Sequence, residues 1–243
     1  SVMSSAAESG KKVVVFDRPN PNGMYVDGPI LDMKYKSGIG WLPIPVVHGL
    51  TMGEIALMAI GEGWSKAADI EVVKCRNYDH QTRYTLPIAP SPNLPTLHSI
   101  YLYPSTCLFE GTVVSMGRGT DAPFEVYGHP AMEGRGFSFV PQPNAGSKNP
   151  PHCGDLCYGV DLRSVAEEDI WHKGLNLEYV VDAYRDLDMG DEFFTPMFEK
   201  LIGVDYVRRM IIEGQSAEEI EKMWQSELEE YKTLRRRYLI YNE

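Results

Sequence analysis

The side chains best suited to chemistry on a polar ligand gather in one stretch of the chain, residues 108–125. This stretch contains Glu110, Arg118, Thr120 and Glu125, with three glycines among them and no helical period. Charged side chains are costly to bury unless they are paired, and glycine permits a close approach of the backbone that a side chain blocks. The stretch therefore predicts a polar loop that lines a pocket between two structural halves, and the pocket suits a hydroxyl-rich ligand.

A second candidate carboxylate, Asp17, follows the apolar run at residues 13–16. A short apolar run of this kind is typical of a buried parallel strand, and open α/β sheets place ligands at the carboxyl ends of such strands. Asp17 and Arg18 are therefore candidates for ligand contact, and a local ion pair between them that fixes the loop is an equal alternative. The chain contains no glycine-rich phosphate cradle and no Walker pattern, so the sequence argues against nucleotide binding.

Two further polar residues, His48 and Asn93, lie in predicted loops. The spacing of Thr51 and Glu54 predicts a capping box at a helix start, so Glu54 is interpreted as a cap and not as a catalytic acid. His48 stands just before this helix, where it suits a ligand contact, although a lone histidine is more often structural. Asn93, in the proline-rich connection at residues 77–95, offers a donor and an acceptor to a sugar, and an Asx turn is an equally good interpretation.

The composition excludes several classes of protein. The 243 residues suffice for one large domain or two modest ones, and the net charge of −11 argues against binding to nucleic acid or to an anionic membrane. The apolar runs are far too short to span a bilayer. No metal site is predicted, because Cys153 and Cys157, with His152 beside them, lack a fourth ligand; free thiols or one disulfide are favoured instead.

The alternation of apolar runs and helical segments predicts an α/β fold. Strands are expected at residues 13–17 and 70–74, with a helix after Thr51 between them, and this order indicates a partial Rossmann-like sheet. The sequence therefore predicts a Rossmann-like domain at residues 1–130, whose N-terminal part is missing. A smaller α+β auxiliary domain with C-terminal helices is expected at residues 131–243.

Helix signals mark both ends of the chain. Residues 1–8 predict the tail of a helix, so the chain is expected to begin inside a structural element, with a further segment before it. Near the other end, Asn176 can cap one helix, and residues 205–213 are expected to form a second helix. Ser216 and Glu219 predict a capping box at the start of the last helix.

Several short motifs occur together in this chain, and together they cover most of its length. They are Asp17-Arg-Pro-Asn-Pro21, His48-Gly-Leu-Thr-Met-Gly-Glu54, Pro90-Ser-Pro-Asn-Leu-Pro-Thr96, Tyr103-Pro104, Glu110-Gly-Thr112, Gly117-Arg-Gly-Thr120, Pro123-Phe-Glu125 and Cys157-Tyr-Gly-Val160. With these motifs the chain resembles the bacterial exo-β-N-acetylmuramidases of the NamZ type, formerly a domain of unknown function. Each motif is weak alone, but their order and spacing are specific.

The resemblance implies a Rossmann-like domain joined to an auxiliary domain, with a cleft between them. It also implies a glycoside hydrolase that removes terminal N-acetylmuramic acid from the non-reducing end of peptidoglycan fragments, without a nucleotide or other cofactor. Such proteins are typically exported to the periplasm or the exterior, or act in cell-wall recycling. The expected partner is therefore a muramic-acid-containing saccharide. Neither binding to nucleic acid nor a membrane span is expected.

Within this resemblance, each candidate residue receives a role. Hydrolysis of a glycosidic bond needs two carboxylates, or one carboxylate and a participating acetamido group. Arg118 is expected to bind the lactyl carboxylate of muramic acid, because a guanidinium binds carboxylates in a bidentate manner; a structural ion pair with Glu110 is the alternative. The predicted catalytic residues are Glu110 and Asp17, and the predicted substrate-binding residues are Arg118, His48, Asn93, Arg18, Thr120 and Glu125.

One departure from the family pattern concerns an upstream segment. Members carry a Gly-Pro-Glu-His-Gly motif whose glutamate is a leading catalytic candidate, and this chain lacks it. The chain therefore resembles the C-terminal two-thirds of such an enzyme, and the missing N-terminal segment is an expected partner. The alternative function is a non-catalytic carbohydrate-binding protein or an inactive fragment.

Overall fold

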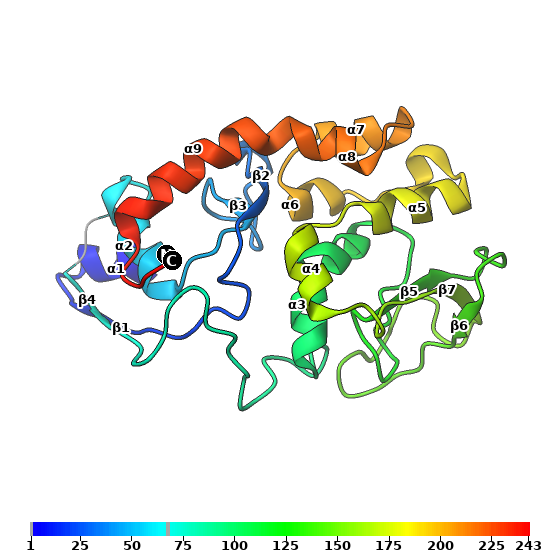
Figure 1. The fold of residues 1–243 in the computed structure, drawn as a ribbon, viewed down its shortest axis with the longest axis horizontal. Helices are drawn as coiled ribbons and strands as arrows, with labels where there is room; N and C mark the ends of the chain where they lie inside the picture. The colour runs from blue at the N-terminus through cyan, green and yellow to red at the C-terminus, as the bar shows by residue number, and fades with distance from the viewer. Residues whose placement is uncertain (1, 67–68) are drawn as a thin grey trace.

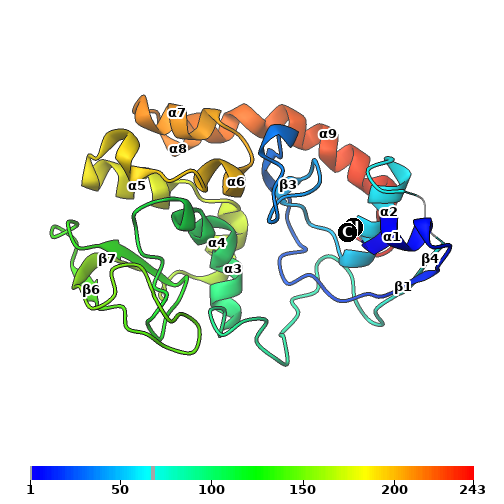
Figure 2. The same cartoon turned by 180° about the vertical axis from the view of Figure 1, so that it is seen from behind.

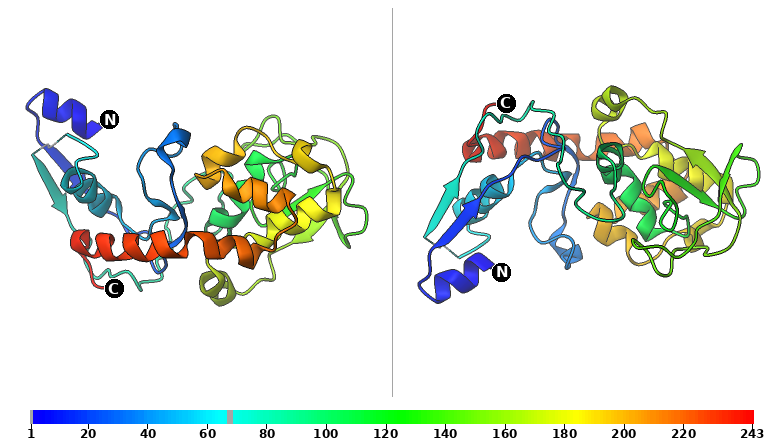
Figure 3. Two further views of the ribbon diagram at one scale, coloured as in Figure 1. Left: turned by 90° about the horizontal axis from the view of Figure 1, so that it is seen from above. Right: turned by 90° about the horizontal axis from the view of Figure 1, so that it is seen from below.

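The protein is mixed α/β, as predicted, and consists of two unequal halves joined along one side by a helix (Figures 1 and 2). The structure is a computed structural model that describes residues 2–66 and 69–243. The helix that joins the halves, α9 (Gln225–Arg235), runs from the helical half towards the end of the chain, which lies beside the N-terminal half. Figure 3 shows a β-hairpin standing between the two halves next to α9.

The smaller half is built around a parallel pair of strands. Strand β1 (Val13–Phe16) pairs with β4 (Ile70–Val73), which confirms both predicted strands. Helix α2 (Met52–Gly61) connects them and packs against β1, and a short helix α1 (Val2–Glu8) precedes them. A Rossmann-like sheet is not confirmed, because within the described residues this parallel sheet has two strands.

The start of α2 follows the sequence closely. The Thr51 hydroxyl accepts the Glu54 amide, and the Glu54 carboxylate accepts the Thr51 amide, so the predicted capping box is confirmed. Glu54 is fully buried in this position. A carboxylate placed in this way satisfies backbone donors that the first turn of a helix leaves without a partner.

The hairpin between the halves consists of β2 (Asp27–Ile30) and β3 (Pro45–Val47), which pair in antiparallel fashion. The residues between these strands form a loop, which we call the flap, with one 3-10 turn, η1 (Met33–Tyr35). Helix α9 packs against β2, so the hairpin is attached to the element that joins the halves. The flap exposes more than half of the Trp41 side chain, and the Lys36 ammonium lies 3.8 Å from the centre of its ring.

The larger half holds the main core. It contains an antiparallel sheet of β5 (Val126–His129), β6 (Phe137–Phe139) and β7 (Cys157–Asp161) in the order β5-β7-β6, and the helices that cover it. Helices α5 (Glu178–Leu187) and α7 (Tyr206–Ile212) confirm two predicted helices, and α8 (Ala217–Glu221) begins with the predicted Ser216–Glu219 capping box. The elements are α3 (Leu97–Thr106), η2 (Cys107–Gly111), β5 (Val126–His129), β6 (Phe137–Phe139), β7 (Cys157–Asp161), α4 (Glu167–Lys173), α5 (Glu178–Leu187), η3 (Gly190–Phe193), α6 (Phe198–Ile202), α7 (Tyr206–Ile212), α8 (Ala217–Glu221), η4 (Lys222–Trp224) and, after α9, η5 (Arg236–Tyr238).

The predicted division at residues 130 and 131 stays a prediction. Strand β5, just before that point, pairs with β7, which follows it.

All four cysteines lie in the described part of the chain, and their thiols are free. No helix in the residues that the structure describes is both long enough and apolar enough to cross a membrane.

Candidate functional site

Two cavities meet at His48, between the hairpin and the two halves. The first, which we call the flap cavity, has a volume of about 560 Å³, and its walls include the flap, His48, Tyr103 and Glu110. The second, which we call the loop cavity, has a volume of about 500 Å³, and its walls include Arg18 and His48. Met52 and His48 belong to both. The structure therefore brings together His48, Glu110 and Arg18 from the predicted set.

His48 is held as a neutral imidazole with a defined tautomer. Its Nδ1 accepts the Leu50 amide at 3.0 Å, so the ring proton lies on Nε2. Burial, and then the nearby Arg235 guanidinium, lower the pKa of His48 to about 4. The Tyr231 hydroxyl donates to the His48 carbonyl oxygen at 3.0 Å and fixes the loop. At neutral pH the ring can therefore donate a hydrogen bond from Nε2 to a ligand oxygen.

This shift of the His48 pKa is expected to destabilise the protein in acid. An unfolded histidine has a pKa of about 6.5, whereas His48 in the folded chain has a pKa of about 4, so unfolding takes up a proton between these values. His48 should then leave the free energy of unfolding unchanged above about pH 6.5 and lower it by about 3 kcal/mol as the pH falls towards about 4. The measurement is urea unfolding across this range, with His48→Asn as the comparison, because the asparagine oxygen can still accept the Leu50 amide. An unaltered pH dependence in the variant would contradict the prediction.

Glu110 and Arg118 form an ion pair, so the two candidates from the glycine-rich stretch do meet. Their side chains are 25% and 29% exposed, respectively, and the Arg118 guanidinium also lies 5.1 Å from the centre of the Phe124 ring. Glu110 lines the flap cavity at the end of η2. A Cβ atom on the next residue, Gly111, would lie 2.5 Å from Phe198 Cα, so glycine is required for η2 to approach α6 this closely.

Two other side chains in the flap cavity carry their protons at neutral pH. Burial raises the pKa of the Tyr103 hydroxyl to about 12. Burial also raises the pKa of the Cys107 thiol to about 12, and the negative charge of Glu110 adds to this second shift. The Tyr103 hydroxyl can donate a hydrogen bond, while a protonated Cys107 is a poor nucleophile. Tyr103, Trp41 and Lys200 line this cavity without having been proposed as site residues. The Tyr103-Pro104 motif was a signal in the sequence that could have identified Tyr103, whereas the sequence around Lys200 contains no such signal.

Asp17 lies outside both sets of lining residues, and its carboxylate is engaged elsewhere. It accepts the Thr51 hydroxyl at 2.6 Å, the Gly53 amide at 2.9 Å and the Tyr241 hydroxyl at 2.9 Å. These donors, and not Arg18, take its oxygens. A catalytic role for Asp17 stays a prediction, and these contacts favour a structural one, because they hold the start of α2 and the end of the chain on β1.

Three predicted substrate-binding residues form contacts within the larger half. The Asn93 amide nitrogen donates to the Gly146 carbonyl oxygen at 2.6 Å, and the Thr120 hydroxyl donates to the Gly117 carbonyl oxygen at 2.7 Å. The Glu125 carboxylate is 5% exposed and accepts a hydrogen bond from the Thr96 hydroxyl at 2.8 Å. Asn93, Thr120 and Glu125 are not among the described residues that line the flap and loop cavities.

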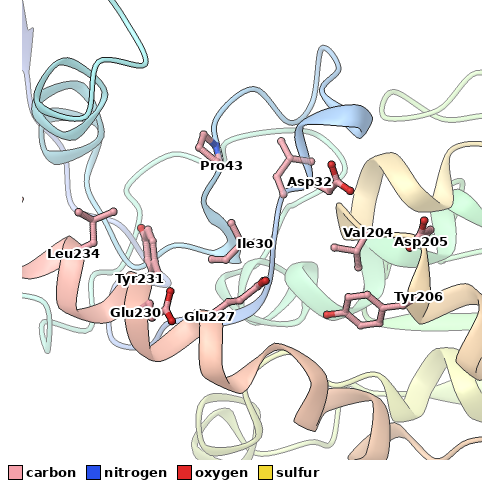
Figure 4. Close-up of a pocket in the computed structure, with 11 residues that line it drawn as sticks. Ile30, Asp32, Pro43, Val204, Asp205, Tyr206, Glu227, Glu230, Tyr231 and Leu234 are labelled. Carbon is pink, nitrogen blue, oxygen red and sulfur yellow. The ribbon is translucent and has the colours of Figure 1, made fainter.

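A third cavity, of about 570 Å³, lies between the hairpin, α7 and α9 and has an acidic wall (Figure 4). Asp32, Asp205, Glu227 and Glu230 line it, along with apolar side chains such as Val204. Lys34 forms ion pairs with the first two of these carboxylates. Because carboxylates repel an anion, this cavity suits an acidic ligand less well than the two that share His48.

Family models match almost the whole chain in two parts. The model described as exo-β-N-acetylmuramidase NamZ, N-terminal, matches residues 1–98, and the model described as exo-β-N-acetylmuramidase NamZ, C-terminal, matches residues 101–241. The chain belongs to the exo-β-N-acetylmuramidase NamZ family. The flap cavity takes His48 from the first matched region and Glu110 from the second, so this NamZ-family chain builds its candidate site where the two regions meet.

Individual relatives agree with the NamZ assignment. The chain is 37% identical to the peptidoglycan β-N-acetylmuramidase NamZ of Bacillus subtilis (strain 168), over 98% of this chain and 62% of that protein. The crystal structure of a DUF1343 family protein from Bacteroides fragilis is 57% identical and superposes with a TM-score of 0.98, over 100% of this chain and 69% of that one. A second DUF1343 family protein from the same organism, 22% identical, shares the fold with a TM-score of 0.83 over 99% of this chain and 69% of that one. The chain thus spans 62% of the length of the curated relative.

Proposed function

We propose that this chain forms the larger part of an exo-β-N-acetylmuramidase, which removes terminal N-acetylmuramic acid from the non-reducing end of peptidoglycan fragments. The NamZ family and the identity to the Bacillus subtilis muramidase support the activity. The observation that carries the proposal is the flap cavity, where the Glu110 carboxylate and the neutral His48 ring line one hollow between the halves. Hydrolysis of a glycoside needs two carboxylates, or one carboxylate and a participating acetamido group, and Glu110 supplies one carboxylate in this cavity.

The residues at the flap cavity have different roles in the proposed reaction. The Arg118 guanidinium balances the charge of Glu110, so this carboxylate suits a base that takes a proton from the attacking water. Protonation of the leaving oxygen needs a second, protonated group, or the acetamido group of the substrate shares the work of displacement. His48 Nε2–H and the Tyr103 hydroxyl are placed to donate hydrogen bonds to sugar oxygens.

Arg18 is the residue that we propose for recognition of the lactyl carboxylate. The sequence alone had favoured Arg118, but the structure engages Arg118 with Glu110. Arg18 is exposed on the wall of the loop cavity, which shares His48 with the flap cavity. A sugar bound at His48 can therefore extend its acidic substituent towards a guanidinium, which binds carboxylates in a bidentate manner.

Replacement of Arg18 by glutamine is expected to remove the preference for the acidic form of the sugar. In the longer enzyme, kcat/KM for a chromogenic N-acetylmuramide should fall about tenfold or more, mainly through KM, because a charge-assisted hydrogen bond is lost. The same substrate with its lactyl acid converted to an amide should be affected little. Arg209→Gln on α7, which removes an exposed arginine that lines neither cavity, is the matched control. Equal losses on the acid and the amide would exclude carboxylate recognition by Arg18.

The activity itself is tested by comparing chromogenic β-glycosides of N-acetylmuramic acid and N-acetylglucosamine. Release from the muramide alone supports the proposed enzyme. Binding of N-acetylmuramic acid in a calorimeter without release from either glycoside would support a carbohydrate-binding protein instead. Absence of both would exclude the proposal.

We further propose that another segment of the longer protein packs on the parallel sheet and completes the enzyme. Parallel strands are normally covered on both faces, yet Phe16 is 77% exposed, Val14 45% and Val73 42%. This chain matches 62% of the relative's length, so the rest of such a longer polypeptide can supply the covering residues. Hydrogen exchange at residues 13–16 tests the idea: protection that is no greater in the longer protein than in this chain would contradict it.

Export to the periplasm or the exterior is proposed on the resemblance alone, because intact peptidoglycan lies outside the cytoplasm. Fractionation of the bacterium that makes the protein, followed by detection with an antibody, tests the location. Recovery only in the cytosol would contradict export and leave cell-wall recycling as the setting.

A further inference from the structure

A cavity of about 300 Å³ at the end of α9 differs in charge from the rest of the protein. Its walls carry three cations, Lys232, Arg235 and Arg236, and a single carboxylate, Glu243. We call this the basic cavity. The chain as a whole has a net charge of −11, so a cluster of cations around one hollow creates a local field that attracts anions.

Buried polar atoms without partners belong to residues of the same cavity. Arg235 is 4% exposed; its Nη1 donates to Glu243 at 2.5 Å and its Nη2 to the Gly49 carbonyl oxygen at 2.9 Å, while Nε has no partner in the described part of the chain. His80 is 2% exposed, and its Nε2 contacts the Glu54 carboxylate at 3.0 Å, while Nδ1 has no partner within residues 2–66 and 69–243. Buried polar groups are almost always hydrogen-bonded, so several buried atoms without partners around one cavity indicate a site for a ligand.

An adjoining cavity of about 210 Å³ extends the same hollow. Its walls share Met24, Tyr25 and Gln81 with the basic cavity, and it adds Trp171. Of the five buried side-chain atoms that lack a partner among the described residues, four belong to residues that line these two cavities. The four atoms are Tyr25 Oη, His80 Nδ1, Trp171 Nε1 and Arg235 Nε.

We propose that the basic cavity binds the oxyanion of a small acid, a carboxylate or a phosphate, and that the Glu243 side chain occupies the same cations when this ligand is absent. The Glu243 carboxylate contacts Arg235 and lies 3.6 Å from Arg236 Nε. Its side chain is 45% exposed, so solvent and solutes reach it. Exchange of this tethered carboxylate for a free oxyanion conserves the charge balance of the cavity and requires no covalent step.

The basic cavity is connected to His48 through the backbone. Arg235 Nη2 holds the carbonyl oxygen of Gly49, the residue that follows His48. After burial, the Arg235 charge is the next cause of the lowered His48 pKa. In Glu243→Gln, where the basic cavity lacks its own carboxylate, an anion bound at Arg235 offsets that charge, so occupancy should raise the pKa of His48, and NMR of that ring can follow it.

Calorimetric titration of the protein with inorganic phosphate, and separately with succinate, tests the proposal at constant ionic strength set with chloride. Saturable binding of either is expected, and the tighter of the two identifies the class of ligand. Glu243→Gln removes the competing carboxylate and should strengthen binding about fivefold, while Arg236→Glu should weaken it about tenfold. Arg236 is 66% exposed at its side chain, so this change leaves the folded core intact.

Arg209→Glu is the matched control, because it makes the same change of charge on exposed α7, remote from the end of α9. It should leave the affinity within a factor of about two, since charges beyond a Debye length are screened. The proposal is overturned if phosphate and succinate both bind no more tightly than chloride does, in the unmodified protein as well as in Glu243→Gln. Equal weakening by Arg236→Glu and Arg209→Glu would also overturn it, because binding would then reflect net charge alone.

Discussion

Replacing Glu110 with glutamine in the longer enzyme is expected to lower kcat for a chromogenic N-acetylmuramide by about 10²- to 10⁴-fold, the range for loss of a positioned general base. Glutamine keeps the shape of the side chain but cannot take a proton from water. Glu110 is the candidate carboxylate that lines the flap cavity together with His48, and this position is the reason for the prediction. KM should change far less, because the variant still offers an oxygen acceptor to the substrate.

The competing explanation is that Glu110 serves only to pair with Arg118. In that case Glu110→Gln and Arg118→Gln should lower the free energy of unfolding by similar amounts, and kcat at low temperature should survive in both. Asp121→Asn, an exposed carboxylate in the same loop, is the matched control for loss of one negative charge. Near-normal turnover by a well-folded Glu110→Gln enzyme would exclude Glu110 from the chemistry.

Replacing Asp17 with alanine is expected to lower the free energy of unfolding by about 3–5 kcal/mol, because each buried donor left without an acceptor costs about 1–3 kcal/mol. The donors are the Thr51 hydroxyl, the Gly53 amide and the Tyr241 hydroxyl. Urea unfolding of the chain gives the measurement. Glu71→Ala is a suitable control, since its ion pair with Lys12 is exposed to solvent and its loss should change the free energy of unfolding little.

Asp17→Asn separates this structural role from the predicted catalytic one. The asparagine oxygen can still accept one or two of the hydrogen bonds, so stability should fall less than in the alanine variant. Turnover by the longer enzyme should persist if Asp17 is structural. A stable Asp17→Asn enzyme without turnover would instead restore Asp17 as a catalytic residue, and a loss of less than about 1 kcal/mol in the alanine variant would contradict the structural role.

Local signals in the sequence were sufficient for much of the fold. The capping boxes at Thr51 and Ser216 were predicted correctly, because each depends on residues three apart in one helix turn. Strands β1 and β4 followed from short apolar runs. The predicted partial Rossmann-like sheet is not confirmed, because the number of strands depends on long-range pairing that the pattern of one strand does not contain.

The candidate site shows the same limit. The sequence placed His48 and Glu110 in one pocket, and both line the flap cavity. It also proposed Asn93, whose amide instead holds Gly146, a partner 53 residues away along the chain. Whether a polar loop residue points to a ligand or to another loop depends on packing between distant segments, and single-sequence motifs carry no information about it.

The polar contacts around β1 have a consequence for biosynthesis. Glu54 accepts an amide that lies 186 residues later in the chain, at Ile240, and Asp17 accepts a hydroxyl 224 residues later, at Tyr241. The ribosome synthesises these partners long after it has made β1 and α2, although nascent domains usually fold in order from the N-terminus. The segment around β1 and α2 is therefore among the last to complete its hydrogen bonds, although it is translated well before these partners. Until then the nascent chain exposes it to chaperones and proteases with these carboxylates only partly satisfied.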